Sequence, residues 1–252
     1  MPEVSVILPC YNSIDYIDES IDSVINQTYQ SFELIIVDDA STDGTYDYIK
    51  SKYGNDHKVS IYKNVQNKGV AHSRNVAIKH SKGRFLSFID SDDIWDLSKL
   101  SEQVAFMKAN NAKISHTSYT FINEIGGHRR GYSEAKDILD LATYLKLTNI
   151  GMSTVIVDSF EISDFKFPEN VKREDFMLWV MLLRGGNVFH GLNSCLTKYR
   201  IRDSQASSNK LEMASSLFLS YMSFNEFSIP KRLSIFISYL INGILKRISR
   251  KA

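Results

Sequence analysis

Four short, continuously apolar runs alternate with longer segments whose apolar residues recur at helical spacing over the first 90 residues. The runs predict strands at 4–9, 32–39, 59–64 and 83–90, and the segments between them predict helices at 13–27, 43–53 and 69–81. Strands that alternate with helices in this way are typical of a parallel sheet covered on both faces. We therefore expect an α/β fold that binds its ligands beyond the carboxyl ends of the strands.

The second half of the chain has a less regular pattern. It predicts helices at 97–110 and 174–186, strands at 112–122 and 152–158, a loop at 126–132, and a late strand that starts at 194 and runs into a polar loop ending at 209. No linker-like stretch and no internal repeat divides the chain. We expect one continuous domain with a helical tail.

The tail, residues 230–252, has the pattern of an amphipathic helix. Its apolar stripe is Leu233, Phe236, Ile237, Leu240, Ile241, Ile244, Leu245 and Ile248, and its basic residues are Lys231, Arg232, Lys246, Arg247, Arg250 and Lys251. A basic amphipathic helix can lie on an anionic membrane surface. It can equally pack on its own domain or on a second copy in a homodimer, and the pattern leaves these alternatives open.

Composition and charge exclude several classes of protein. A net charge of +1 argues against a nucleic-acid partner. The two cysteines, Cys10 and Cys195, form no CxxC pair, which argues against a zinc site and fits a reducing cytoplasm. The N-terminus has no basic region before its apolar run, so it predicts a strand rather than a signal peptide. No apolar run reaches the ~18 residues that a membrane span needs.

Three carboxylates follow the predicted strand 83–90 in the stretch "FIDSDDIW": Asp90, Asp92 and Asp93. Like charges at this spacing raise one another's pKa, so we expect a cation beside them. Two carboxylates one residue apart can both reach Mg²⁺ or Mn²⁺, which often share carboxylates with substrate phosphates.

Two further features belong to the same expected edge of the sheet. Asp38 and Asp39 end the predicted strand 32–39, and Arg74 lies one turn into the helix 69–81. Both have a simpler interpretation, because the aspartates could cap the next helix and the arginine could be a solvated surface charge.

Five motifs in this order carry a resemblance to a known family: "VSVILPCYN", "ELIIVDDASTDGT", "NKGVAHSRNVAI", "GRFLSFIDSDDIW" and "REDFMLW". Together they resemble family-2 glycosyltransferases of the GT-A fold, over roughly residues 3–205. The later segments "NIGMSTVIVD" and "YRIRDSQASSNK" are similar to transferases of teichuronic acid and O-antigen synthesis. The resemblance implies a GT-A domain over 1–210, with a nucleotide-binding half at 1–110 and an acceptor-binding half at 111–210, before a tail at 211–252.

The resemblance also implies roles for individual residues. Those assigned to the nucleotide are Pro9, Tyr11, Asp38, Asp39, Arg74, Asp90 and Ser91. Tyr11 would stack on the base, which we expect to be uracil, and Asp39 would bind the base by a hydrogen bond. Asp92, with Asp90, would hold the Mn²⁺ or Mg²⁺ that bridges the two phosphates.

The "ED" pair before the predicted helix 174–186 supplies the catalytic groups in this resemblance. Asp175 would be the base that takes the proton of the acceptor hydroxyl, and Glu174 would help to orient the acceptor. A single displacement inverts the anomeric carbon, so an α-linked donor gives a β-linked product. The alternative is that both acids only stabilise the start of the helix through its dipole.

One position departs from the commoner family pattern, in which a histidine follows "YRx". Here the residue is Arg202, which cannot ligate a metal but can pair with phosphate. We expect Arg202, with Ser204, to stabilise the leaving diphosphate, unless Arg200 and Arg202 are simply a surface basic pair. Trp95 and Trp179 are candidates for contact with the acceptor sugar, or for the core.

The expected function is that of an inverting glycosyltransferase. It would move a sugar from UDP-glucose, UDP-galactose or UDP-N-acetylglucosamine to a lipid-linked glycan, on the cytoplasmic face of a bacterial cell membrane, during surface polysaccharide synthesis. One alternative is a catalytically silent protein that keeps the nucleotide-sugar pocket. A dinucleotide-dependent oxidoreductase is disfavoured, because no G-x-G-x-x-G motif follows the first strand.

Overall fold

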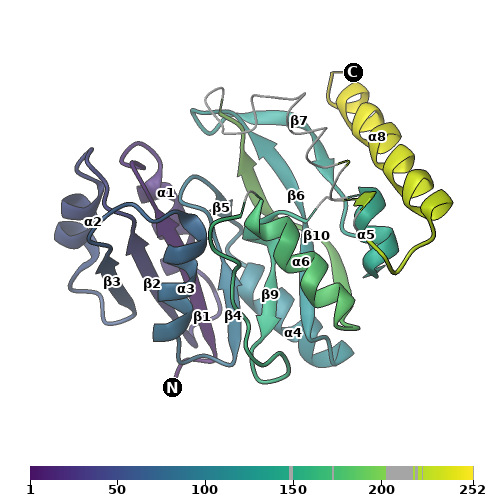
Figure 1. Ribbon diagram of the computed structural model, residues 1–252. Coiled ribbons are helices and arrows are strands. Elements are labelled where there is room, and N and C mark those ends of the chain that lie inside the picture. The colour runs from purple at the N-terminus through teal and green to yellow at the C-terminus, as the bar shows by residue number, and fades with distance from the viewer. Residues whose placement is uncertain (148–149, 172, 203–217, 219–220, 223, 252) are drawn as a thin grey trace.

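The structure is a computed structural model that describes residues 1–147, 150–171, 173–202, 218, 221–222 and 224–251, without the side chains of 244–251 (Figure 1). The first half forms strands β1 (Val4–Cys10), β2 (Phe32–Asp38), β3 (Val59–Lys63) and β4 (Phe85–Phe88), with helices α1 (Ile17–Ile25), α2 (Thr45–Tyr53) and α3 (Val70–His80). β1 pairs in parallel with β2 and β4, and β2 pairs in parallel with β3. The parallel α/β arrangement predicted from the sequence is confirmed.

The second half extends the same sheet. Its strands are β5 (Ile94–Trp95), β6 (Ile114–Ile122), β7 (His128–Ser133), β8 (Ile138–Leu139), β9 (Ile156–Asp158) and β10 (Phe189–Arg200), and its helices are α4 (Lys99–Asn110), α5 (Leu141–Leu147), the 3₁₀ turn η1 (Met152–Thr154), α6 (Glu174–Arg184) and α8 (Ile229–Lys251). Within the described residues the strand order is β3-β2-β1-β4-β9-β6-β10-β5, with β7 beside β6 and β8 beside β10.

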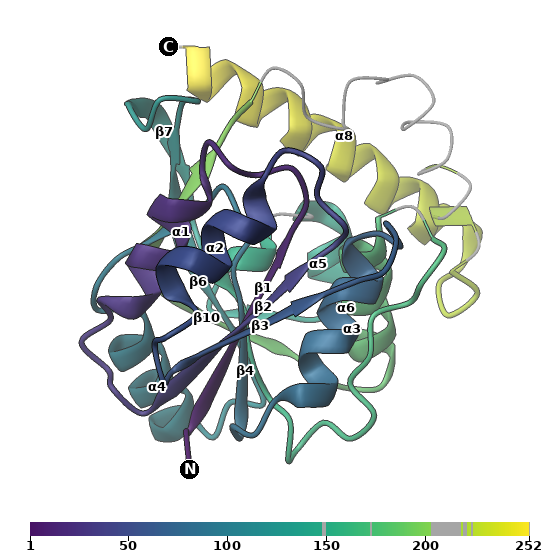
Figure 2. The ribbon, with the colours of Figure 1, turned by 90° about the vertical axis from the view of Figure 1, so that its left-hand side faces the viewer.

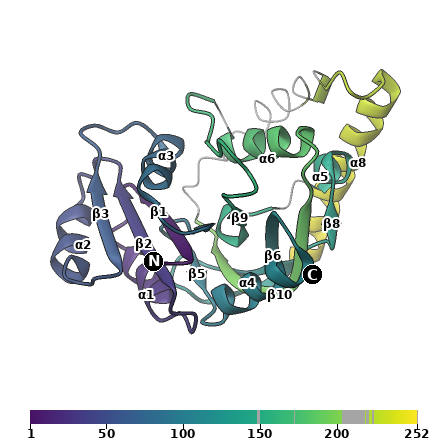
Figure 3. The ribbon, with the colours of Figure 1, turned by 90° about the horizontal axis from the view of Figure 1, so that it is seen from below.

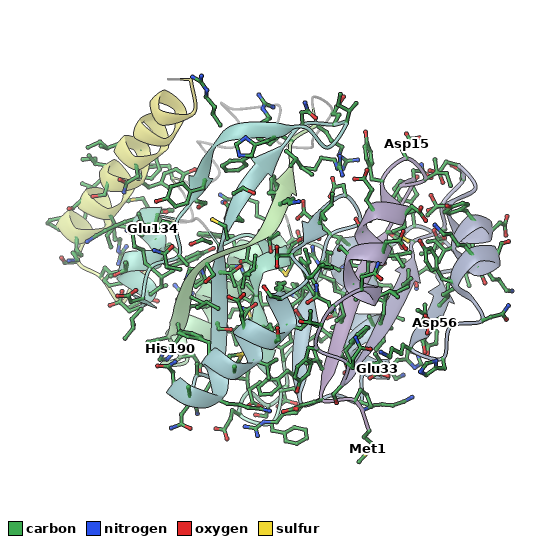
Figure 4. All side chains as sticks on the ribbon, turned by 180° about the vertical axis from the view of Figure 1, so that it is seen from behind. Met1, Asp15, Glu33, Asp56, Glu134 and His190 are labelled. Carbon is green, nitrogen blue, oxygen red and sulfur yellow. The ribbon has the colours of Figure 1, made fainter. Side chains whose placement is uncertain are left out.

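Strand directions bring the ends of distant strands to one edge. β9 is antiparallel to both β4 and β6, and β10 is parallel to β6, so β6 and β10 run in the same direction as β1 and β4. The residues that follow β1, β2, β4 and β10 therefore leave the same edge of the sheet, which we call the carboxyl edge. In Figure 4, Asp15 in the loop after β1 marks this edge at the upper end, and Met1 and Glu33 lie toward the lower end.

Both faces of the sheet are covered, because alternate residues of each strand point to opposite sides. Val6 and Leu8 of β1 pack in one hydrophobic cluster with Ile21 of α1, whereas Ile7 packs in a second cluster with Ala77 of α3. Figure 3 shows α1 and α4 on one face of the sheet and α3 and α6 on the other. The apolar core thus fixes the positions of the strand ends at the carboxyl edge.

Three expectations for the second half are wrong. The predicted loop 126–132 is mostly strand β7, which pairs with β6 after a turn in which Gly126 has a φ of +80°. All residues of β7 before Ser133 are exposed, so the sequence of this strand has no alternation of apolar and polar residues that would predict it. The expected strand at 152–158 is a 3₁₀ turn followed by the three residues of β9, and β10 begins at Phe189 rather than at residue 194.

The amphipathic helix predicted in the tail is present as α8. It contacts α5 and β7 of its own domain, and Asn242 Nδ2 donates a hydrogen bond to Lys146 O at 3.1 Å. No helix among the described residues has both the length and the apolar character needed to cross a membrane.

Candidate active site

The acidic turn after β4 holds its three carboxylates in different environments. Asp93 is 1% exposed, and its two oxygens accept hydrogen bonds from Arg200 N at 2.9 Å and from Ser153 Oγ at 2.5 Å. Burial raises the pKa of Asp93 well above its usual range, and the charges of Asp90 and Asp92 raise it further. Asp93 therefore ties the turn to β10 and is not available to a ligand.

Asp90 and Asp92 are the two carboxylates that remain accessible. Their side chains are 32% and 13% exposed, and Asp92 Oδ2 lies 2.9 Å from Arg202 Nε. Burial, and then the neighbouring Asp90, raise the pKa of Asp92, while Arg202 acts in the opposite direction. Each of the two carboxylates has an arginine on one side, Arg74 for Asp90 and Arg202 for Asp92, and both keep some exposure to solvent.

Arg74 of α3 joins this turn to the start of α6. Its Nη2 donates to Asp90 Oδ1 at 2.7 Å and its Nη1 donates to Glu174 Oε1 at 2.9 Å. Arg74 is 3% exposed, and its guanidinium lies over the ring of Phe167, 5.1 Å from the ring centroid. Both terminal nitrogens of Arg74 are thus paired with carboxylates, and its contact with the nucleotide stays a prediction. Arg74 positions these two carboxylates.

Replacing Arg74 by methionine is expected to lower the free energy of unfolding by about 2–3 kcal/mol. The change leaves two partly buried carboxylates facing each other without their shared cation, and half-broken buried ion pairs are costly. Chemical denaturation of the variant measures the loss. Lys113→Met is the control, because Lys113 and Glu161 form a pair that is half exposed on both sides, and it should change stability by less than about 1 kcal/mol. An Arg74→Met protein as stable as the wild type would contradict this role.

The two acids of the "ED" pair, Glu174 and Asp175, are the first two residues of α6. Arg173 precedes them with a φ of 60°, a strained backbone conformation for a side chain of this kind. Both acids lie in the first turn of the helix, and Asp175 Oδ1 accepts a hydrogen bond from Phe176 N at 2.6 Å. Because Glu174 shares Arg74 with Asp90, the first turn of α6, which also carries Asp175, is tied to the acidic turn. The sequence separates these residues widely, and only the fold brings them together.

The end of β10 supplies two arginines with different roles. Arg200 is 1% exposed, donates from Nε to Asp92 O at 2.8 Å and from Nη1 to Glu124 O at 2.8 Å, and forms an ion pair with Glu19. Sequence reasoning did not assign a role to Arg200, and the structure shows that it fixes the acidic turn. Arg202 Nε lies 2.9 Å from Asp92 Oδ2, and its contact with a diphosphate stays a prediction. Ser204 lies outside the described residues.

Asp38 and Asp39 shape the loops at the carboxyl edge. Asp38 is fully buried and accepts a hydrogen bond from Ser41 N at 3.0 Å, so its expected contact with a nucleotide is wrong. Asp39 is 3% exposed and accepts hydrogen bonds from Lys68 N at 2.9 Å and Gly69 N at 2.7 Å. It thereby fixes the loop that leads into α3, and its contact with the base stays a prediction.

The loop after β1 borders the acidic turn. Ser13 Oγ lies 2.8 Å from Ser91 Oγ, which links the two segments directly. Tyr11 is 47% exposed, so its ring is available to a flat ligand such as a base. Pro9 is buried at the end of β1, where its missing N–H costs no ladder hydrogen bond because β4 has already ended.

The two candidate acceptor-binding tryptophans belong to the core. Trp95 is 2% exposed, and its Nε1 donates a hydrogen bond to Ser153 O at 2.8 Å. Lys99 Nζ lies over its ring, 4.0 Å from the ring centroid. Trp179 is fully buried and packs edge-to-face on Phe189, with 5.1 Å between the ring centroids. Neither ring can reach a sugar, so both expectations are wrong.

The acidic turn fits a divalent cation that is shared with a substrate. Among the described residues no cluster of three or more His, Cys, Asp or Glu side chains could enclose a metal ion by itself. Asp90 and Asp92 nevertheless offer hard oxygen donors on an accessible edge, and Mg²⁺ commonly binds one or two carboxylates together with phosphates. A diphosphate is thus the natural source of the remaining oxygens.

A mainly parallel sheet covered on both faces, with an acidic turn after β4, is the arrangement of a GT-A glycosyltransferase fold, and the comparisons with known proteins agree. The sequence model of the family described as "Glycosyl transferase family 2" matches residues 5–165 of this chain. The chain belongs to glycosyl transferase family 2, as its motifs predicted.

Named relatives match nearly the whole chain. The chain is 34% identical over 247 residues to TuaG of Bacillus subtilis (strain 168), which is named as a glycosyltransferase of teichuronic acid biosynthesis, with 98% of each protein covered. It is 35% identical over 245 residues to WfgD of Escherichia coli, a UDP-Glc:alpha-D-GlcNAc-diphosphoundecaprenol beta-1,3-glucosyltransferase, with 96% of this chain and 94% of WfgD covered.

Solved structures share the fold. The chain superposes on Staphylococcus aureus TarS 1–349 in complex with UDP-GlcNAc with a TM-score of 0.72 and 24% identity, covering 97% of this chain and 73% of TarS 1–349. The mannosyltransferase PcManGT from Pyrobaculum calidifontis, in complex with GDP-Man and Mn²⁺, gives a TM-score of 0.68 and 17% identity, covering 99% of this chain and 72% of PcManGT.

Proposed function

We propose that this protein is an inverting glycosyltransferase that moves a sugar from a UDP-sugar to a hydroxyl of a lipid-linked glycan. The observation that carries the proposal is the Arg74 bridge, which ties the acidic turn at Asp90 to Glu174, the residue before Asp175. This bridge supports a single site in which a donor diphosphate meets a carboxylate for the acceptor hydroxyl. The names of the relatives WfgD and TuaG support the class of acceptor.

The donor binds along the carboxyl edge. The exposed ring of Tyr11 stacks on the uracil, with Pro9, Asp39 and Ser91 bordering the nucleoside. Asp90 and Asp92 hold a divalent cation, Mn²⁺ or Mg²⁺, together with the diphosphate oxygens. When bound, this cation neutralises negative charge that develops on the leaving diphosphate.

Arg202 provides a second positive charge at the diphosphate. In the free protein its Nε lies 2.9 Å from Asp92 Oδ2. With Asp92 and Asp90 as the residues that would hold the cation, the guanidinium of Arg202 would bind a phosphate oxygen, which suits its fork of N–H groups. Arg202 thus takes a position that a histidine holds in many relatives, and it stabilises the leaving group without ligating the metal.

Asp175 acts on the acceptor. It takes the proton of the acceptor hydroxyl as the oxygen attacks the anomeric carbon on the side opposite the diphosphate. The new C–O bond forms while the bond to the diphosphate breaks, and the UDP leaves with the electron pair. The anomeric centre is inverted, so an α-linked UDP-sugar gives a β-linked product. Glu174, held by Arg74, orients the acceptor.

The reaction takes place at the cytoplasmic face of a bacterial membrane, where a lipid-linked acceptor is accessible, in the synthesis of O-antigen, capsule or a teichuronic-type polymer. Residues 1–110 bind the nucleotide, 111–210 build the acceptor side, and 211–252 form the tail. Glucose is the first sugar to test, because WfgD and WfaP of Escherichia coli are both named for UDP-Glc. Galactose and N-acetylglucosamine are the alternatives.

The test is a transfer assay with UDP-glucose, UDP-galactose and UDP-N-acetylglucosamine, each with Mn²⁺ and diphosphoundecaprenol-linked N-acetylglucosamine. We expect one UDP-sugar to give a β-linked product and free UDP. Binding of UDP-sugars by calorimetry without transfer to this or other lipid-linked glycans would favour the catalytically silent alternative. Failure of every UDP-sugar to bind would overturn the proposal.

A further inference from the structure

One side of α8 is fixed to the protein's own domain. Ile235 is 1% exposed in the hydrophobic core. Phe236 packs edge-to-face on Tyr221, with 5.4 Å between the ring centroids, and Tyr221 in turn donates a hydrogen bond to Leu145 O in α5. Tyr239 also packs against this cluster. This side needs no further partner.

The side of α8 that faces away from these contacts is also apolar. Leu233, Ile237, Leu240 and Ile241 are 41%, 54%, 41% and 52% exposed. Their spacing of four, seven and eight residues places them on one stripe of the helix, which we call the α8 stripe. A row of large apolar side chains left in water beside a packed face indicates a surface that is covered by something else.

The charge around the α8 stripe identifies the covering surface. No acidic residue follows Glu226, whereas the remaining 26 residues contain Lys231, Lys246, Arg247, Arg250 and Lys251, besides Arg232, which donates hydrogen bonds to Met222 O and Phe227 O of its own chain. A second copy docked on the same stripe would bring two such basic segments together, and the repulsion would oppose a dimer. An anionic bilayer supplies both an apolar layer for the stripe and negative charge for the basic residues.

Strand β7 adds to the same surface. α8 contacts β7, whose residues His128, Arg129 and Tyr132 are exposed. In both Figure 1 and Figure 2, β7 and the end of α8 lie at the upper end of the molecule, toward which β1 runs from the N-terminus below. This is the end that carries the carboxyl edge and the acidic turn.

We propose that the α8 stripe and the exposed side of β7 form one docking surface for an anionic lipid bilayer. The helix lies along the membrane interface and does not cross it, and the carboxyl edge is held next to the lipid surface. That docking would bring a lipid-linked acceptor to the active site rests on the proposed function. Binding to the bilayer does not depend on that function, so an experiment can disprove either proposal without the other.

The test is flotation of the full chain with vesicles, without donor or acceptor. Vesicles of phosphatidylcholine with phosphatidylglycerol are compared with vesicles of phosphatidylcholine alone, and Ile237→Ser/Leu240→Ser is compared with the wild type. The control is Ile138→Ser/Phe160→Ser, which changes two apolar residues that are 59% and 76% exposed and lie near the start of β10 and the end of β9, away from the carboxyl edge. All three proteins should have the same thermal unfolding midpoint.

We expect the wild type and the control to float with the anionic vesicles, and the α8 variant to bind them at least about tenfold less. High salt should weaken the wild-type binding. Equal binding of the variant and the wild type, or no preference for the anionic vesicles, would overturn the proposal. Sedimentation that shows a wild-type dimer and a monomeric α8 variant would assign the stripe to a second copy instead, and would also overturn it.

Discussion

Asp175→Asn is expected to lower the rate of sugar transfer by about 10³-fold, with donor binding changed less than about twofold. An asparagine keeps the shape of the side chain and can still accept a hydrogen bond from Phe176 N, but it cannot take the proton of the acceptor hydroxyl. The loss should therefore appear in the catalytic rate and not in the affinity for the UDP-sugar. Steady-state transfer kinetics and calorimetry with the donor measure the two quantities separately.

A matched control separates this role from a structural one. Asp47 lies in the first turn of α2, as Asp175 lies in the first turn of α6. Asp47→Asn removes a similar interaction with the helix dipole, worth about 0.3–1 kcal/mol, and should leave transfer unchanged. If Asp175→Asn lost only stability, by an amount like that of Asp47→Asn, and kept its transfer rate, Asp175 would be a helix-stabilising residue and the base would have to be sought elsewhere.

Asp92→Ala is expected to weaken UDP binding in the presence of Mn²⁺ by about 100-fold and to leave the binding of uridine nearly unchanged. The substitution removes one of the two accessible carboxylates that hold the cation, and the cation joins the protein to the diphosphate but not to the nucleoside. Calorimetry with UDP and with uridine, each with and without Mn²⁺, gives the comparison. In the wild type, removing the metal should have a similar effect on UDP.

Asp15→Ala is the control for this experiment, since Asp15 is an exposed carboxylate in the loop at the same end of the molecule. It should not alter the effect of Mn²⁺ on UDP binding. A parallel loss for UDP and uridine in Asp92→Ala would mean that the substitution disturbs the whole edge. Unchanged affinity for UDP would mean that Asp92 does not hold the cation, and Arg202 would then be the main positive charge at the diphosphate.

The first half of the fold could be predicted because each strand of a doubly covered parallel sheet is a continuous apolar run, and each helix shows its own period. The order of the carboxylates along the carboxyl edge followed from that prediction. The second half could not be predicted as well, because β7 is exposed and β9 has only three residues. Neither produces a pattern of hydrophobic positions.

The sequence predicted which residues belong to the site, but not which of them contact one another. Motif spacing identified Asp92 and Arg202, which the structure brings within 2.9 Å. It could not show whether a polar or aromatic side chain points inward, which is why Asp38 and the two tryptophans were misassigned. The contact of Arg74 with Glu174 spans 100 residues of sequence and depends on α3 and α6 covering the same face of the sheet.

The donor site is tested most directly by a crystal structure of the protein with UDP and manganese, with the ion located by its anomalous scattering. We expect manganese between the carboxylates of the acidic turn and the diphosphate, with the uracil against the ring of Tyr11. A diphosphate bound away from Asp90 and Asp92, or manganese at another place on the protein, would contradict the assignment of this edge as the donor site.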